Sequence, residues 1–139
     1  MSIVSLRLAG LLKRAQAQLL GELGPALAPF GIDGRELAVL TALSAGGPVS
    51  QQELSQALTI DRTTMVALVD AMSARGLVAR GADPGDRRKN LIEATAAGRK
   101  IAGEAAVAVD EVEDRFLASV PVADRAALLR ILRELTRDV

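Results

Sequence analysis

The stretch "TIDRTTMVALVDAMSARGLVARGADPGDRRKNLIEAT" (residues 59–95) changes its pattern halfway along. In its first half, apolar residues recur at the steps of one helix face, and Asp61 is a residue type that caps helix N-termini well. These features predict a helix from Arg62 to about Arg75, which ends at Gly76. The residues predicted to be buried on that helix are Met65, Leu68, Val69 and Met72. In the second half, two short runs with strand character flank an Asp-Pro-Gly-Asp turn and predict a two-stranded hairpin.

Two shorter helices are predicted before this stretch, each with a capping box at its start. The segment "DGRE" (residues 33–36) opens the first helix, which ends at the Gly-rich "SAGGP". The segment "SQQE" (residues 50–53) opens the second, which runs to Leu58, and an extended link at Pro48 and Val49 joins the two. Helix, turn and helix followed by a hairpin are typical of a winged helix-turn-helix.

Longer amphipathic helices are predicted at both ends of the chain. The first spans residues 3–23 and stops at the Gly/Pro cluster "GELGPALAPFG". Thr95 caps another from Ala96 to about Ser119, and the last runs from about Ala123 to Arg137. The apolar stripes of these helices include Val4, Leu8, Leu11, Leu12, Leu19 and positions in 101–116 and 128–135. They exceed what one small domain can cover, and a second copy of the chain is the simplest partner.

The predicted architecture is a single domain over residues 1–139, mainly α with a small β-hairpin wing. Residues 33–95 would form the winged helix-turn-helix region, and residues 1–30 and 96–139 would form a helical dimerisation region. The length of 139 residues is that of one ordinary domain.

Composition excludes several classes of function. The chain has no Cys and no His, which removes disulfides and the commonest metal ligands, and no metal or cofactor is expected. Paired carboxylates and a nucleophile elbow are also missing, so we expect no enzyme. With two Phe and no Tyr or Trp, a protein that stacks single-stranded bases is disfavoured. No apolar run spans a membrane and the N-terminus lacks the pattern of a secretory signal, so we expect a cytoplasmic protein.

Charge is balanced overall and uneven along the chain. The 17 basic and 17 acidic side chains cancel, yet residues 61–90 hold six basic and four acidic ones. Residues 103–114 hold five acidic side chains and no basic one, a pattern that usually marks a solvated helix face. A local basic patch on a neutral chain can bind a polyanion where the patch lies.

The helix 62–75 is the predicted recognition helix for the major groove of DNA. Arg62 can donate two bonds to a guanine edge, and Thr63 and Thr64 can bond bases or phosphates. Val66 and Ala67 could touch a thymine methyl group. Three further residues, Ser50, Gln51 and Gln52, open the preceding helix, where free backbone N–H groups suit a phosphate.

The basic tip of the hairpin is the second predicted DNA contact. Arg87 or Arg88 could enter a minor groove, with Lys89 beside them, because a narrow A·T-rich groove concentrates negative potential. Asp86 lies two residues before Arg88, close enough to pair with it and fix its direction. The alternative is an exposed turn whose charges only prevent edge-to-edge aggregation.

Residues 33–98 resemble the multiple-antibiotic-resistance regulator (MarR) family of bacterial transcription factors. The most specific parts are "IDRTTMVALVDAM", "RGLV" and "DPGDRR", followed by the Thr-x-x-Gly of Thr95 and Gly98. The resemblance implies a homodimeric repressor on a pseudo-palindromic operator, which a small lipophilic or phenolic molecule commonly releases. It also implies that Asp86 and Arg88 are the wing pair. The residues at recognition-helix positions are Arg62, Thr63, Thr64, Val66 and Ala67.

Two further expectations concern other roles. An effector would bind in a crevice between the helical and winged regions, with aliphatic walls from Leu12, Leu19, Leu40 and Met65, each of which is also a candidate for plain core. A winged-helix module that binds proteins and not DNA is the alternative function. The zero net charge favours it, as does Ala67, where the family often has a basic residue, while the basic side chains of residues 62–89 argue against it.

Overall fold

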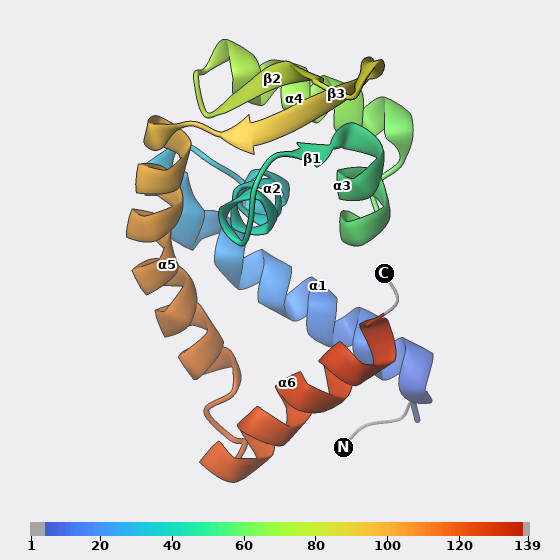
Figure 1. Cartoon of the computed structure of the whole chain (residues 1–139). Helices are drawn as coiled ribbons and strands as arrows, with labels where there is room; N and C mark the ends of the chain where they lie inside the picture. The colour runs from blue at the N-terminus through green and yellow to red at the C-terminus, as the bar shows by residue number, and fades with distance from the viewer. Residues whose placement is uncertain (1–4, 138–139) are drawn as a thin grey trace.

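The structure is a computed structural model that describes residues 5–137, apart from the side chains of Asp83, Arg87, Arg88 and Lys89. It is mainly helical with a small antiparallel sheet, so the predicted fold class is confirmed (Figure 1). The helices are α1 (Leu8–Leu27), the 3-10 turn η1 (Ala28–Phe30), α2 (Gly34–Ser44), α3 (Gln51–Leu58), α4 (Arg62–Ala74), α5 (Ala96–Phe116) and α6 (Val122–Thr136). The strands are β1 (Val49–Ser50), β2 (Val78–Asp83) and β3 (Asp86–Ala94). None of the helices among residues 5–137 is long and apolar enough to cross a membrane.

The predicted two-stranded hairpin is confirmed as β2 and β3, and it belongs to a sheet of three strands. The strand order is β1-β3-β2, with Val49 opposite Ile92 and Val78 opposite Ala94. The extended link before α3 supplies β1, which pairs with the free edge of β3. Two residues are too few to show the alternation that identifies a strand in a sequence.

Helix α1 differs from its prediction at both ends. Residues 5–7 are not helical, and the helix continues through Pro25 to Leu27 instead of stopping at the Gly/Pro cluster. A proline inside a helix removes a hydrogen bond and costs about 3 kcal/mol. The burial of Leu27, which is completely inaccessible, and the packing of Leu23 on the core offset that cost. Helix α5 also ends earlier than predicted, at Phe116.

The core lies where α2, α4, the sheet and the first half of α5 meet. Leu40, Met65 and Ile92 are fully buried in it, together with Val69 and Met72 of the predicted buried face of α4. Leu68 from the same face is partly buried and packs on the core. The predicted apolar face of α4 is therefore correct.

The Thr-x-x-Gly motif joins the start of α5 to the end of α4. The Thr95 hydroxyl accepts a bond from the Gly98 N–H at 3.1 Å and donates one to the Gly76 carbonyl at 2.6 Å. A Cβ atom on Gly98 would lie 2.1 Å from the Leu77 carbonyl oxygen, so only glycine fits there. Gly76 has φ of +72° and ends α4 with bonds from Gly76 N–H to Ser73 and from Leu77 N–H to Met72. The motif thus fixes where α5 leaves the winged region.

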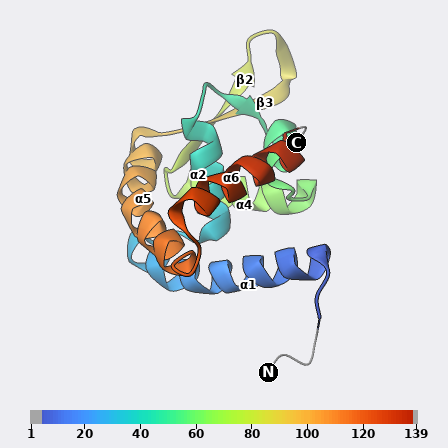
Figure 2. The same cartoon turned by 90° about the horizontal axis from the view of Figure 1, so that it is seen from below.

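Helix α6 lies apart from the core. Figure 1 shows it below α2 and the sheet, and Figure 2, seen from below, shows it crossing in front of α2, with the hairpin projecting at the edge away from α1. None of its fifteen residues, all of which the structure describes, is buried. Its exposed apolar residues include Leu128, Leu129, Ile131 and Leu135.

Candidate nucleic-acid interface

The N-terminus of α4 is held by Asp61. One carboxylate oxygen of Asp61 accepts the Thr64 backbone N–H at 2.8 Å, and the other accepts the Thr64 hydroxyl at 2.7 Å. These two bonds hold the pKa of Asp61 below its ordinary value of 3.8. The hydroxyl of Thr64 is therefore engaged in the cap, and its side chain is half-buried.

Four of the predicted recognition-helix residues share the open face of α4. Arg62, Thr63, Val66 and Ala67 are all exposed, while the opposite face of the helix is buried in the core. Their backbone is rigidly set by the cap at Asp61 and by the core contacts of Met65.

Helix α3 begins beside this face. The Ser50 hydroxyl accepts the Glu53 N–H at 3.1 Å, which is one of the two bonds of the predicted capping box. At the far end of α3, Thr59 adopts a left-handed conformation with φ of +54° and turns the chain towards α4.

A hollow of about 500 Å³ lies where α3, α4 and the wing converge. Every residue that lines it is polar: Ser50, Gln51, Gln52, Glu53, Gln56, Arg62 and Asn90. The structure therefore brings the predicted residues of α3 together with Arg62. Glu53, Gln56 and Asn90 were not predicted as site residues, and Glu53 brings one acidic side chain to the hollow. Gln56 is one helical turn after Gln52, and Asn90 reaches the hollow only because β3 runs back past α3, which no sequence spacing reveals.

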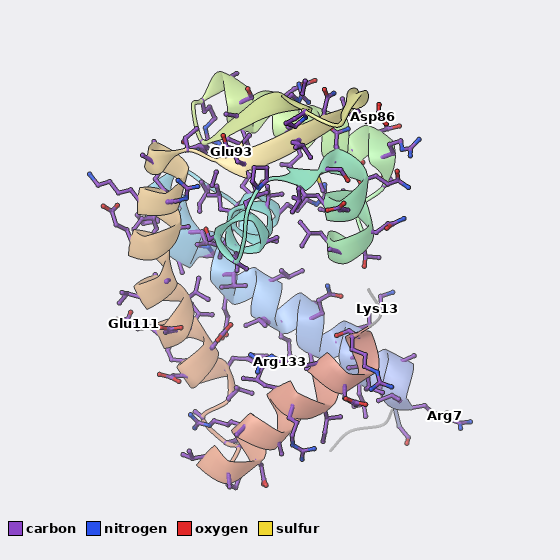
Figure 3. The ribbon with its side chains drawn as sticks, in the orientation of Figure 1. Arg7, Lys13, Asp86, Glu93, Glu111 and Arg133 are labelled. Atoms are coloured by element: carbon purple, nitrogen blue, oxygen red, sulfur yellow. The ribbon has the colours of Figure 1, made fainter. Side chains whose placement is uncertain are left out.

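The wing is tied to α4 by an ion pair between Arg80 of β2 and Asp70 of α4. This pair offsets the negative charge of Asp70, which is exposed on α4. Asp86 lies at the tip of the hairpin and Glu93 nearer to α5 (Figure 3). The pairing of β2 with β3 shifts its register between Ala82 and Asp83, just before this tip. The side chains of Arg87, Arg88 and Lys89 lie outside the described part of the chain, so their roles stay predictions.

The predicted effector residues do not meet in one cavity. Leu40 and Met65 are fully buried and pack as core, whereas Leu12 is exposed and Leu19 half-buried on α1. A hollow of about 370 Å³ does lie at the junction of α1, α2 and the turn before α4. Different residues line it: Gln16, Leu20, Gly34, Arg35, Ala38, residues 58–61 and Thr64. In the described part of the chain, no group of three Asp or Glu side chains could hold a metal ion.

These features define a winged helix-turn-helix protein, and comparisons assign its family. The MarR family model matches residues 30–89. The HTH-type transcriptional repressor Mb2911 of Mycobacterium bovis is 30% identical over 92% of either chain. The chain belongs to the MarR family, which confirms the resemblance seen in its sequence. The HTH-type transcriptional repressor NicR of Pseudomonas putida is 33% identical over 72% of this chain, and the match spans 63% of NicR.

Solved structures give the same assignment over nearly the whole chain. A MarR-family transcriptional regulator from Rhodococcus sp. RHA1 is 30% identical with a TM-score of 0.88, over 97% of this chain and 99% of that one. CouR of Rhodococcus jostii RHA1, solved on a 23-mer DNA duplex, is 32% identical with a TM-score of 0.84, over 93% and 92% of the two chains. The proteins to which this chain is similar are regulators of transcription and not enzymes.

Proposed function

We propose that this protein is a sequence-specific DNA-binding regulator that represses transcription as a homodimer on a pseudo-palindromic operator. The observation that carries the proposal is the polar hollow shared by α3, α4 and β3, beside the open face of α4. The DNA-bound structure of CouR, a relative of similar fold, supports it. A role in bacterial transcription also agrees with the expected cytoplasmic location.

In this proposal the winged region grips two adjacent grooves. Arg62, Thr63, Val66 and Ala67 enter the major groove, where the Arg62 guanidinium donates to a guanine edge. The hollow beside them receives a phosphate, with Ser50, Gln51 and Gln52 at the start of α3 as donors. Thr64 supports this face through the Asp61 cap, to which its hydroxyl donates.

The wing makes the minor-groove contact. Arg88 and Arg87 enter the groove, Lys89 adds positive charge, and Asp86 orients Arg88. Each phosphate neutralised by such a side chain contributes about 0.9 to the slope of log affinity against log salt concentration.

A second copy of the chain covers the exposed apolar faces of α1 and α6. Leu8 and Leu11 of α1 and Ile131 and Leu135 of α6 each expose about half or more of their surface. Monomeric soluble proteins rarely leave a large contiguous apolar surface in water. A twofold dimer would carry two recognition helices and read half-sites about one helical turn apart, roughly 10 base pairs.

A small molecule would regulate the dimer from the hollow between α1 and the turn before α4. Its volume of about 370 Å³ suits a small ligand, and Leu20 and Ile60 offer apolar walls beside the exposed guanidinium of Arg35. One structure of CouR holds p-coumaroyl-CoA, so a relative of similar fold binds a small molecule. A ligand seated there would contact both α1 and the start of the recognition helix.

Selection of bound sequences from a random duplex pool tests the proposal. We expect recovery of a twofold-symmetric site with half-sites about 10 base pairs apart. On that site, Arg62→Ala should cost about 1–3 kcal/mol and relax the preference at one base position. The control Arg99→Ala removes the same charge from an exposed position on α5 and should leave the preference intact. A pure protein that binds no duplex at low salt would instead point to a module for protein contacts.

A further inference from the structure

One arginine at the end of α4 connects three segments of the chain. Arg75 follows the last residue of α4, and its guanidinium donates to the Glu36 carboxylate of α2. The same guanidinium donates to the backbone carbonyl of Gly31, in the turn between α1 and α2. The sequence separations are 39 and 44 residues, so only the folded chain brings these groups together.

Both partners of Arg75 are rigidly held. Glu36 is nearly buried, and its second carboxylate oxygen accepts the Asp33 N–H at 3.1 Å as part of a complete capping box. Gly31 has φ of +69°, a conformation that fixes the direction of its carbonyl and that side chains rarely adopt. A buried carboxylate that has lost its cationic partner is strongly unfavourable, so Arg75 stabilises the position of Glu36 as well as its own.

We propose that Arg75 is a positioning residue that sets the angle of the recognition helix relative to the helical region. The other strong contacts of α4 are its apolar face on the core and the pair between Asp70 and Arg80 of the wing. The core also includes Leu27 of α1 and Ala105 of α5, so it holds α4 against both regions through apolar contacts, which are not directional. Arg75 adds a directional polar contact from the end of α4 to the turn that follows α1. This inference rests on the proposed function, because the angle matters only where two recognition helices must meet two half-sites.

The consequence is a test based on spacing. Adding one base pair between half-sites rotates one of them by roughly 35° and moves it by roughly 3.4 Å about the duplex. A dimer with rigidly placed recognition helices loses affinity on such a site. A dimer whose α4 is released at one end can adjust to the altered spacing, so it loses less affinity.

The experiment measures affinity on the selected site and on versions with one base pair added or removed. The spacing penalty is the factor by which affinity falls when one base pair is added or removed. For Arg75→Gln we expect this penalty to be smaller than that of wild type by about threefold or more. Glu36→Gln keeps an oxygen for the Asp33 N–H and loses the charge that holds Arg75, so it should shrink the penalty similarly. The double variant should then add little to either single one, because both remove the same contact. Arg75→Lys keeps the charge but cannot reach two acceptors in a fork, and an intermediate penalty is expected.

Controls separate this inference from the proposed function. Arg99→Gln loses one positive charge on α5 and should keep the wild-type penalty. Thermal unfolding of each variant identifies any that are not folded, and Arg75→Lys then replaces Arg75→Gln. If wild type and the Arg75 variants show the same spacing penalty, the role proposed for Arg75 is wrong and the proposed function stands. A wild-type protein that binds no duplex would overturn both.

Discussion

The winged region and helix α6 bury their apolar residues to very different extents. In the winged region Leu40, Met65 and Ile92 are completely inaccessible, whereas on α6 Leu135 is 68% exposed and no residue is buried. Burial of apolar surface is the main favourable contribution to folding. The winged region therefore holds its shape through its own contacts, while α6 gains little from its own chain. Stability of the fold and stability of the assembly should respond to different substitutions.

The largest effect is expected from Gly98→Ala, which disrupts the close contact between the start of α5 and the winged region. The new Cβ would lie 2.1 Å from the Leu77 carbonyl oxygen and 3.0 Å from the Leu40 side chain. Since a backbone atom cannot move aside without shifting β2 or α5, we expect the free energy of unfolding to fall by about 3 kcal/mol or more. Urea unfolding measures this.

A matched control is Gly103→Ala on the same helix. A Cβ there meets nothing within 4 Å, and alanine favours helix over glycine, so stability should rise by up to about 1 kcal/mol. Equal responses of the two variants would mean that the close approach at Gly98 does not constrain the fold.

The next effect concerns α6 alone. Ile131→Asp places a charge on the exposed apolar stripe, and a dimer with twofold symmetry would contain this change twice. Burial of one such side chain contributes about 1.5–3 kcal/mol, so the dissociation constant of the dimer should rise about 30-fold or more. Sedimentation at several concentrations measures the dissociation constant, and circular dichroism should show a folded winged region. Arg133→Ala, on the opposite side of α6, is the control that should leave the dimer intact. An unchanged dimer of Ile131→Asp would show that this stripe is not the contact.

The same contrast explains which features the sequence could predict. The caps of α2, α3 and α4 depend on neighbouring residues such as Asp33, Ser50 and Asp61, and local spacing identified all three. The end of α1 depends on the burial of Leu27 against distant residues, which outweighs the local signal of Pro25. Strand β1 likewise exists only because β3 offers it an edge.

The candidate site divides in the same way. Ser50, Gln51, Gln52 and Arg62 were predicted from their places at helix N-termini, and they share one hollow. Asn90 and the contact between Arg75 and Glu36 arise from tertiary folding, so periodicity could not single them out. The fold was thus more predictable than the site, because helix periodicity is local and site geometry is not.

A smaller effect should separate two helix ends inside the winged region. Helices α3 and α4 both end in a residue with positive φ, which is Thr59 in one and Gly76 in the other. A β-branched residue in this conformation is a true outlier, and the cost for a residue with a Cβ is roughly 1–2 kcal/mol. Thr59→Gly should therefore raise the free energy of unfolding by about 0.5–1 kcal/mol, after allowance for the greater freedom of glycine in the unfolded chain. Gly76→Thr, the reverse change at the matching position, should lower it.

The smallest effects on stability appear when the pH is changed. They have opposite signs for Asp61 in the winged region and Glu113 on α5. In the winged region, the Thr64 backbone N–H and hydroxyl lower the pKa of Asp61 in the folded protein. Its ionised form therefore stabilises the fold above its ordinary pKa of 3.8, and that contribution is lost as the pH falls through the lowered pKa. Asp61→Asn keeps an oxygen for the cap and loses the charge, so it should be less stable than wild type at pH 7. The difference should shrink at pH values below the lowered pKa.

Glu113 of α5 should respond in the opposite direction. Burial, followed by repulsion from Asp110 and Asp114, raises its pKa above the ordinary value of 4.5. The contribution of Glu113 is then fully present below pH 4.5 and is lost as the pH rises through the raised pKa, because ionisation is less favourable in the folded chain. Glu113→Gln should therefore be more stable than wild type at pH 7 and equal to it below pH 4.5. Carboxyl titration by NMR measures the pKa values of Asp61 and Glu113 directly. Shifts of the same sign for both residues would contradict the opposite effects expected from the hydrogen bonds of Asp61 and the burial of Glu113.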